Sequence, residues 1–288
     1  MPFLSPGFKE KLREYHLNLL KGRGTVGGSR RSARTGRSLE LADFRPYSPG
    51  DELKRVDFKA YARLRKLFVK VYEEEEEGNF VILLDRSLSL DFGEPSKFFI
   101  AQKVASLIAF LSLNQREKAL FFPIPQDNEK PIYLNHINHY RYFEEHLSHL
   151  LPAGKFPSLA EFKNLLESIP FRGGVYLLTD LFLPSEFISY WRQLKLHSLA
   201  FTVIAIQSYE ELEPPEIGEV NLRDLEEEDR LSFYFQKESI QLYKERYNDY
   251  FRKRVEEIVK AGGKCFFLNN LDTDDALLCR LLKEGVIS

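Results

Sequence analysis

A run of five apolar residues, Phe80–Leu84, ends abruptly at Asp85 and constrains the fold of this chain more than any other feature. The run is too short for a typical helix and contains β-branched residues, so it predicts a strand that is buried on both faces. Buried strands of this kind occur in parallel sheets that are covered by helices. Ligands of such sheets bind beyond the carboxyl ends of the strands, and Asp85 lies at such an end.

The chain after this strand alternates between strand and helix patterns. The predicted order is strand 80–84, helix 96–113, strand 119–122, a short strand at 131–134, helices 140–150 and 159–169, strand 174–180, helix 185–196, strand 199–206, helix 237–261, strand 264–268 and helix 273–283. This alternation predicts an α/β fold with a parallel, doubly wound sheet. The acidic stretch 207–236 interrupts it and predicts an inserted, projecting β-hairpin.

The residues before the main sheet differ in composition from the rest. Residues 21–70 contain 14 Lys and Arg against 5 Asp and Glu, although the whole chain has 41 against 43. Such asymmetry indicates an acidic partner for this segment, either another molecule or an internal run such as 73–77. Nucleic acid is not expected as that partner, because the arginine-rich part lacks interleaved aromatic residues. We expect an amphipathic helix over 4–20, a short helix at 56–64 and a strand at 67–72.

These patterns predict two parts. Residues 1–78 form an N-terminal extension packed on the main domain, and residues 79–288 form that domain.

Hard oxygen donors gather at the predicted strand ends. Asp85, Ser87 and Ser89 follow one strand at alternate positions, and Asp180 ends another. Carboxylate and hydroxyl oxygens suit Mg²⁺, so the sequence predicts a site for Mg²⁺ or another divalent cation at this rim. The alternative is that Asp85 and Ser87 only cap the following helix.

The spacing Asp-x-Ser-x-Ser with a later strand-end aspartate resembles the metal-ion-dependent adhesion site of the von Willebrand factor A fold. The resemblance implies that the hydroxyls touch the metal, that the acids act largely through water, and that one coordination position stays open for a partner's carboxylate. It also implies a threonine from a later loop, for which this chain offers Ser158. Ser158 has an alternative role as a helix N-cap. A degenerate site that keeps the fold without the ion is the competing interpretation.

A second group of residues lies outside the metal motif. Arg45-x-Tyr47-x-Pro49-Gly50-Asp51, then Asp57, Ala62-Arg63 and Lys70, are similar to the bacterial family called domain of unknown function 58. Members of that family carry a von Willebrand factor A-like domain and tend to be encoded beside MoxR-type AAA ATPases. The resemblance implies a Mg²⁺-dependent protein-interaction module that serves as an adaptor or partner of such an ATPase in complex assembly or metal insertion. Arg45, Asp51, Arg63 and Lys70 are candidate partner-binding residues, or else ion pairs that fix the extension.

An enzyme is not expected. Asp85 with Mg²⁺ could be the nucleophile of a haloacid-dehalogenase-like phosphatase, but that motif needs a second aspartate where this chain has Ser87. The sequence contains no HExxH helix, Walker loop or nucleophile elbow. The longest weakly polar run, Val104–Leu113, is far shorter than the roughly 20 residues that span a bilayer. With no signal-peptide pattern and only two cysteines, we expect a cytoplasmic protein.

Overall fold

The computed structural model forms two compact units. It describes residues 2–18, 39–48, 57, 60–61, 63, 65–74, 79–126, 130–169, 174–184, 186–187, 200–214, 218–223, 230–235 and 237–288. Unit 1 comprises Met1–Gly24 with Gly78–Ser288, and unit 2 comprises Thr25–Glu77. The first 24 residues, which the sequence places in the N-terminal extension, therefore group with the main domain. Packing of the remaining extension on that domain stays a prediction.

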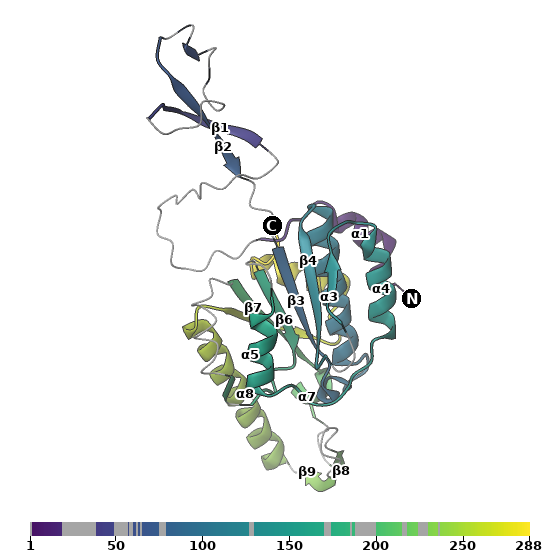
Figure 1. Ribbon diagram of the computed structural model, residues 1–288. Helices are drawn as coiled ribbons and strands as arrows, with labels where there is room; N and C mark the ends of the chain where they lie inside the picture. The colour runs from purple at the N-terminus through teal and green to yellow at the C-terminus, as the bar shows by residue number, and fades with distance from the viewer. Residues whose placement is uncertain are drawn as a thin grey trace. The chain divides into compact units, whose positions relative to one another are not determined.

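A six-stranded sheet forms the centre of unit 1 (Figure 1). Its strands are β3 (Asn79–Asp85), β4 (Lys118–Ile124), β5 (Ile132–Leu134), β6 (Gly174–Thr179), β7 (Ala200–Gln207) and β10 (Lys264–Asn269). The order across the sheet is β10-β7-β6-β3-β4-β5, and all neighbours are parallel except β5, which pairs antiparallel with β4. The predicted α/β fold with a mostly parallel sheet is confirmed.

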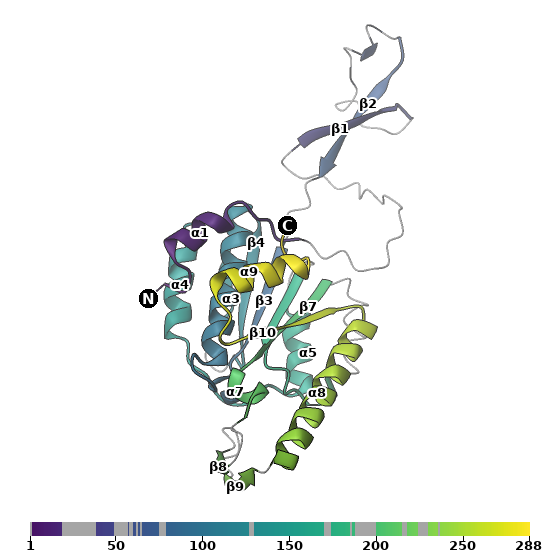
Figure 2. The same ribbon diagram turned by 180° about the vertical axis from the view of Figure 1, so that it is seen from behind.

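Helices cover both faces of this sheet, and β3 shows why. Residues Phe80 to Asp85 of this strand are all buried, and alternate side chains point to opposite layers. Phe80, Ile82 and Leu84 belong to the core cluster formed with α1 (Pro6–Leu12), α3, α4 and α9, whereas Val81 and Leu83 belong to the cluster formed with α5 and α8 (Figures 1 and 2). The helices are α3 (Lys97–Asn114), α4 (His139–His149), α5 (Leu159–Glu167), α8 (Lys237–Lys260) and α9 (Asp274–Lys283). The helix predicted at 185–196 lies almost entirely outside the described residues.

The N-terminal helix is shorter than predicted. Helix α1 spans Pro6–Leu12, so the expectation of a helix over 4–20 is wrong for residues 13–18, and residues 19–20 lie outside the described residues. The chain instead extends beside the C-terminus, where His16 and Ser288 exchange backbone hydrogen bonds of 2.9 Å in both directions. This pairing buries Leu17 and Ile287, which gives the extended segment apolar burial that a continued helix would not provide there (Figure 2).

Helix α3 is the core helix of unit 1. Among the described residues it alone is long and apolar enough to cross a membrane by length and composition, with a mean hydropathy of 1.2. However, 83% of it is buried inside the protein. A buried core helix passes the same test, so this helix is weak evidence for a span.

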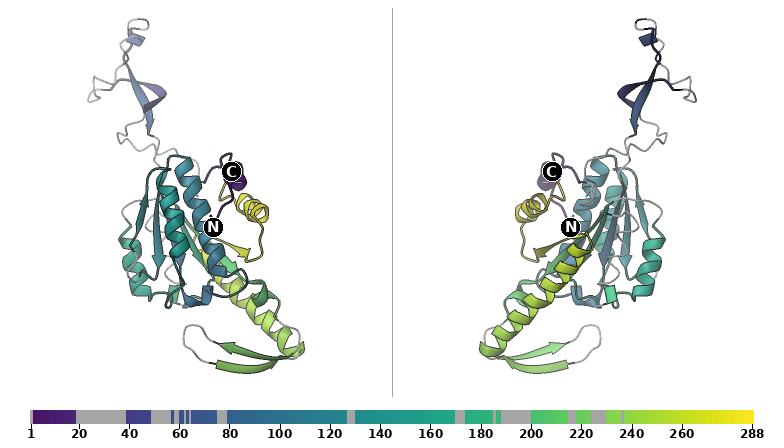
Figure 3. Two further views of the ribbon diagram at one scale, coloured as in Figure 1. Left: turned by 90° about the vertical axis from the view of Figure 1, so that its right-hand side faces the viewer. Right: turned by 90° about the vertical axis from the view of Figure 1, so that its left-hand side faces the viewer.

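The predicted hairpin is also present. Strands β8 (Gly218–Arg223) and β9 (Arg230–Phe235) pair antiparallel, and they lie between the short helix α7 (Tyr209–Leu212) and α8. Figure 3 shows the hairpin at the end of α8 where that long helix begins.

Unit 2 contains an antiparallel pair, β1 (Leu39–Pro46) and β2 (Phe68–Glu74), with an irregularity between Leu41 and Asp43. The Asp57 carboxylate accepts a 3.1 Å hydrogen bond from the Ala60 amide, and the Tyr61 amide donates to the Asp57 carbonyl. These bonds start a helical turn close to the helix predicted at 56–64.

Candidate functional site

Asp85 lies at the carboxyl end of β3, beside the end of β6. It is fully buried. Its Oδ1 accepts a 2.8 Å hydrogen bond from the Ser87 amide, and its Oδ2 accepts a 2.6 Å bond from the Thr179 hydroxyl. Among the described residues no basic side chain forms an ion pair with it. Burial, and secondarily the charge of nearby Asp180, raise the pKa of Asp85 from 3.8 to about 7.

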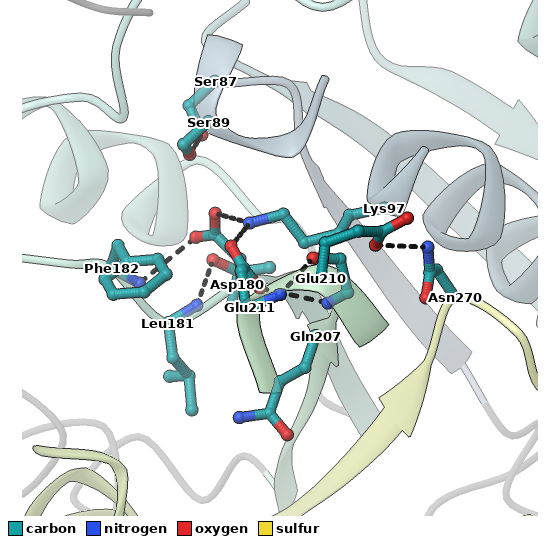
Figure 4. Close-up of polar contacts among 12 residues, drawn as sticks. Ser87, Ser89, Lys97, Asp180, Leu181, Phe182, Gln207, Glu210, Glu211 and Asn270 are labelled. Carbon is teal, nitrogen blue, oxygen red and sulfur yellow. Dashed lines mark hydrogen bonds and ion pairs between the residues drawn. The ribbon is translucent and has the colours of Figure 1, made fainter. Parts of the chain in front are cut away.

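The two serines of the motif lie on the loop that follows Asp85. Ser87 precedes the short 3₁₀ turn η2 (Leu88–Leu90), and Ser89 lies within it. Their hydroxyl oxygens are 3.0 Å apart and hydrogen-bonded to each other. Figure 4 shows both side chains on the same side of the Asp180 carboxylate. The structure therefore brings Asp85, Ser87, Ser89 and Asp180 to one rim of the sheet, as the sequence predicts.

Asp180 has a partner that the sequence interpretation missed, namely Lys97 at the start of α3. The Lys97 ammonium lies 3.0 Å from Asp180 Oδ2 and 2.6 Å from Glu211 Oε1, and its side chain is 1% exposed. Burial by itself lowers the pKa of Lys97, but the two carboxylates outweigh burial, so the pKa is raised above 10.5. Lys97, Asp180 and Glu211, here called the lysine triad, form a buried ion-pair network (Figure 4).

The backbone around the lysine triad is held in a fixed shape. Leu181, directly after Asp180, has a φ of 66°, a left-handed conformation that is uncommon for a residue other than glycine. Its amide donates to the Thr179 hydroxyl at 3.2 Å, and its carbonyl accepts from the Tyr250 hydroxyl at 3.2 Å. The Phe182 amide then donates to Asp180 Oδ1 at 3.1 Å. This turn aims the Asp180 carboxylate at Lys97.

Glu211 is fixed by a capping box at the start of α7. The Ser208 amide donates to Glu211 Oε2 at 3.0 Å, and the Glu211 amide donates to the Ser208 hydroxyl at 3.2 Å. Asn270 joins this helix to the loop before α3, since its Oδ1 accepts from the Tyr209 amide and its Nδ2 donates to the Pro95 carbonyl. These hydrogen bonds join the start of α7, the loop before α3 and the loop after β10 beside the lysine triad.

Ser158 is the predicted site residue whose hydrogen bonds lie outside the candidate metal site. It is the exposed N-cap of α5, where its hydroxyl donates to Glu161 Oε2 at 2.7 Å and accepts from the Glu161 amide at 3.4 Å. No hydrogen bond joins it to the other four candidates in the described part of the chain. Its loop does reach the motif, because the Leu88 amide donates to the Gly154 carbonyl at 3.1 Å. A metal role for Ser158 stays a prediction.

Ser158→Ala is expected to lower the free energy of unfolding by about 1 kcal/mol, with the same loss in Mg²⁺ and in chelator, because it removes a helix cap. Chemical denaturation in the two buffers measures this. Thr273→Ala, which removes the corresponding N-cap of α9, is the matched control. A Ser158→Ala loss that appears only in Mg²⁺ would instead identify a ligand.

The donor set fits a divalent cation in part. Asp85 supplies a buried carboxylate that forms no ion pair within the described part of the chain, and Ser87 and Ser89 supply adjacent hydroxyls. Asp180 completes the set only by sharing its carboxylate with Lys97. Within the described residues no group of three or more His, Cys, Asp or Glu side chains is placed to hold a metal. An ion at this rim would therefore rely on one or two carboxylates, the serine hydroxyls and water, and Mg²⁺ sites often combine few carboxylates with water.

The candidate partner-binding residues lie in unit 2. Arg45 is on β1 opposite Val69, and Lys70 is on β2 opposite Phe44. Arg63 is exposed, and Asp51 lies outside the described residues. Their role in partner binding stays a prediction.

Three residues of the rim were missed from the sequence: Thr179, Lys97 and Glu211. Thr179 directly precedes the strand-end Asp180, which was a usable signal. Glu211 follows the end of β7 in the pattern Ser208-x-x-Glu211, a capping box that places an acid at a third strand end. Lys97 offered no local signal, since a lysine in the first turn of a helix is ordinarily solvated.

Solved structures with a similar arrangement share little sequence with this chain. The conserved hypothetical protein BatB from Bacteroides thetaiotaomicron is 14% identical, with a TM-score of 0.45 over 72% of this chain and 98% of that one. An aerotolerance-related membrane protein from Bacteroides fragilis is 13% identical, with the same score and coverage. A von Willebrand factor type A protein from Catenulispora acidiphila is 13% identical, with a TM-score of 0.42 over 73% of this chain and 42% of that one.

The family comparison is more extensive. No curated protein matches the chain. The family described as "Protein of unknown function DUF58" matches residues 43–255, which include the whole rim from Asp85 to Glu211. The predicted family is confirmed, and the chain belongs to DUF58.

Proposed function

We propose that this protein is a non-enzymatic interaction module that binds a partner protein through a divalent cation, Mg²⁺ in the first instance, at the carboxyl rim of its sheet. Asp85, Ser87, Ser89 and Asp180 would hold the ion, and a carboxylate of the partner would complete its coordination. The proposed partner is a MoxR-type AAA ATPase, and the proposed compartment is the cytoplasm.

The single observation that supports this proposal most is the state of Asp85. Asp85 is fully buried and forms no ion pair with any residue that the structure describes, which is costly for a carboxylate, and burial raises the pKa of Asp85 accordingly. Such a group is retained at functional sites more often than in purely structural cores. A divalent cation beside the Ser87 and Ser89 hydroxyls would supply the missing positive charge.

The surroundings of the rim support protein binding. Phe92 and Phe182 flank the Lys97 ammonium, with ring centroids 5.9 Å and 5.5 Å from it, yet the two residues are 41% and 46% exposed. Tyr209 on α7 is 50% exposed. Aromatic residues that are exposed in the free protein, around a polar centre, are typical of the residues that become buried when a protein interface forms.

A second candidate function follows from the lysine triad. Lys97 already gives Asp180 a positive partner, so the same rim is compatible with a metal-free scaffold of von Willebrand factor A type that binds its partner without an ion. The two candidates differ in whether Mg²⁺ matters.

Excess MgCl₂ is expected to raise the melting temperature of the wild type by about 5–10 °C relative to EDTA, if the ion is present at ~100 times its dissociation constant. Asp85→Ala is expected to abolish this rise, because it removes a rim carboxylate that forms no ion pair with any described residue. Differential scanning calorimetry of both proteins measures it. Superimposable wild-type curves in MgCl₂ and EDTA would favour the metal-free scaffold.

Recovery of a MoxR-type ATPase on immobilised wild-type protein in MgCl₂, and its loss in EDTA or with Asp85→Ala, would support the partner. Equal recovery in all three arms would contradict an ion-mediated contact.

A further inference from the structure

Lys97 occupies an unusual position for a lysine. Its side chain crosses the rim at 1% exposure and ends between two carboxylates that come from different strand ends, Asp180 after β6 and Glu211 after β7 (Figure 4). Buried ammonium groups are costly unless they are paired, and both contacts here are at hydrogen-bond distance. The lysine triad therefore holds a unit positive charge permanently at one of the proposed metal ligands.

A divalent cation and this ammonium need the same carboxylate. Asp180 Oδ2 receives Lys97, while Asp180 Oδ1 accepts from the Phe182 amide, so neither oxygen is free of a donor. A cation held by Asp85, the two serines and Asp180 would share the Asp180 carboxylate with the ammonium, and like charges that share one carboxylate repel strongly where water is excluded. Binding of the ion thus requires Lys97 to release Asp180 or to share it.

We infer that Lys97 is a built-in competitor of the divalent cation, which weakens metal binding at the rim and keeps Asp180 neutralised when no metal is bound. This inference rests on the proposed function and names its regulation. Lys97 acts through Asp180, so it is a positioning residue and not a metal ligand.

Glu211 provides the alternative position for the ammonium. Its carboxylate is 2.6 Å from Lys97 and is anchored to Ser208, and its backbone carbonyl accepts from the Tyr243 hydroxyl of α8 at 2.9 Å. When Lys97 leaves Asp180 it remains paired with Glu211. Competition therefore requires only a small movement of the lysine side chain and not the exposure of an unpaired charge.

Titration of the full chain with MgCl₂ by isothermal titration calorimetry tests the inference. Lys97→Met is expected to lower the Mg²⁺ dissociation constant about tenfold or more, because it frees Asp180 and removes a nearby positive charge. Lys103→Met is the matched control. Lys103 lies six residues further along the same helix and pairs with Asp274 of α9, so its loss changes the net charge equally without touching the rim. We expect Lys103→Met to stay within threefold of the wild type.

A second variant separates competition from simple charge. Lys97→Met with Glu211→Gln removes one positive and one negative group, so net charge is unchanged while Asp180 is still released. Glutamine retains the capping box with Ser208, which favours a folded protein even where Lys97→Met alone fails to fold. Competition for Asp180 predicts tighter Mg²⁺ binding in this double variant as well.

The outcomes distinguish the inference from the proposed function. A wild type that binds Mg²⁺ no more weakly than either Lys97 variant would overturn the inference and leave the proposed function standing. Binding by the Lys97 variants but not by the wild type would support the inference and overturn Mg²⁺ dependence of the natural protein. An absence of binding in every variant would overturn both.

Discussion

Replacing Lys97 by methionine is expected to lower the free energy of unfolding by about 3–5 kcal/mol in the absence of divalent metal. The side chains of Lys97, Asp180 and Glu211 are 1%, 2% and 14% exposed, so the variant leaves two carboxylates near each other without a cation or bulk water. Removing one partner of a buried network costs far more than the network contributes in total, because the remaining charges stay desolvated. Urea denaturation in EDTA measures the loss.

The Lys103→Met control should lose only about 1 kcal/mol or less, since its ion pair with Asp274 is partly exposed. Lys97→Met with Glu211→Gln should recover part of the loss, because only one carboxylate then lacks its cation. Equal stability of Lys97→Met and Lys103→Met would contradict the account of the lysine triad as a buried, mutually dependent network.

Much of the fold could be predicted because its signals are local. The Phe80–Leu84 run has no polar position to face water, so it identifies a central strand before any partner is known. The helices that cover it show their own apolar periodicity. The N-terminal segment was mispredicted for the opposite reason. Leu17 is buried against Ile287, a residue 270 positions away, and helical spacing alone cannot distinguish that pairing from the continuation of α1.

The residues of the candidate site also differ in whether a local sequence signal identifies them. Asp85 and Asp180 were found because a strand that stops at an acid is visible in the sequence, and the carboxyl ends of parallel strands share one rim. Lys97 and Glu211 meet across 114 positions, and their contact depends on the side-by-side placement of β3, β6 and β7. The sequence therefore revealed Asp85 and Asp180, but neither Glu211 nor the lysine ammonium that Asp180 already holds.

The free energy of unfolding of the wild type is expected to fall as pH rises from about 4 to 7, because of the Asp85 carboxyl group. Its pKa is raised from 3.8 to about 7 by burial and by Asp180, so the folded protein keeps a proton that the unfolded chain has released in this window. Stability falls with pH wherever the folded state binds more protons. Each pH unit is worth ~1.4 kcal/mol, which gives up to roughly 4 kcal/mol above pH 7.

Asp85→Asn should remove this pH dependence of stability and be more stable than the wild type above neutral pH by up to ~4 kcal/mol. The asparagine side-chain oxygen can accept the hydrogen bond from the Ser87 backbone amide, and the side chain does not ionise. Denaturation midpoints measured in EDTA across the window test this. Asp91→Asn, which removes an exposed carboxylate from the same loop, should keep the wild-type profile. Parallel profiles for the wild type and Asp85→Asn would show that Asp85 does not titrate there.

Excess MgCl₂ should reduce the difference in free energy of unfolding between the wild type and Asp85→Asn, because a cation stabilises the ionised Asp85 and has no such effect on the asparagine side chain. A protein that becomes more stable when a buried acid is neutralised retains that acid at the expense of its own stability. Such a cost is expected where the carboxylate is kept for a ligand. A stability difference that stays constant on adding MgCl₂ would instead show that Asp85 has a structural role and no role in binding the ion.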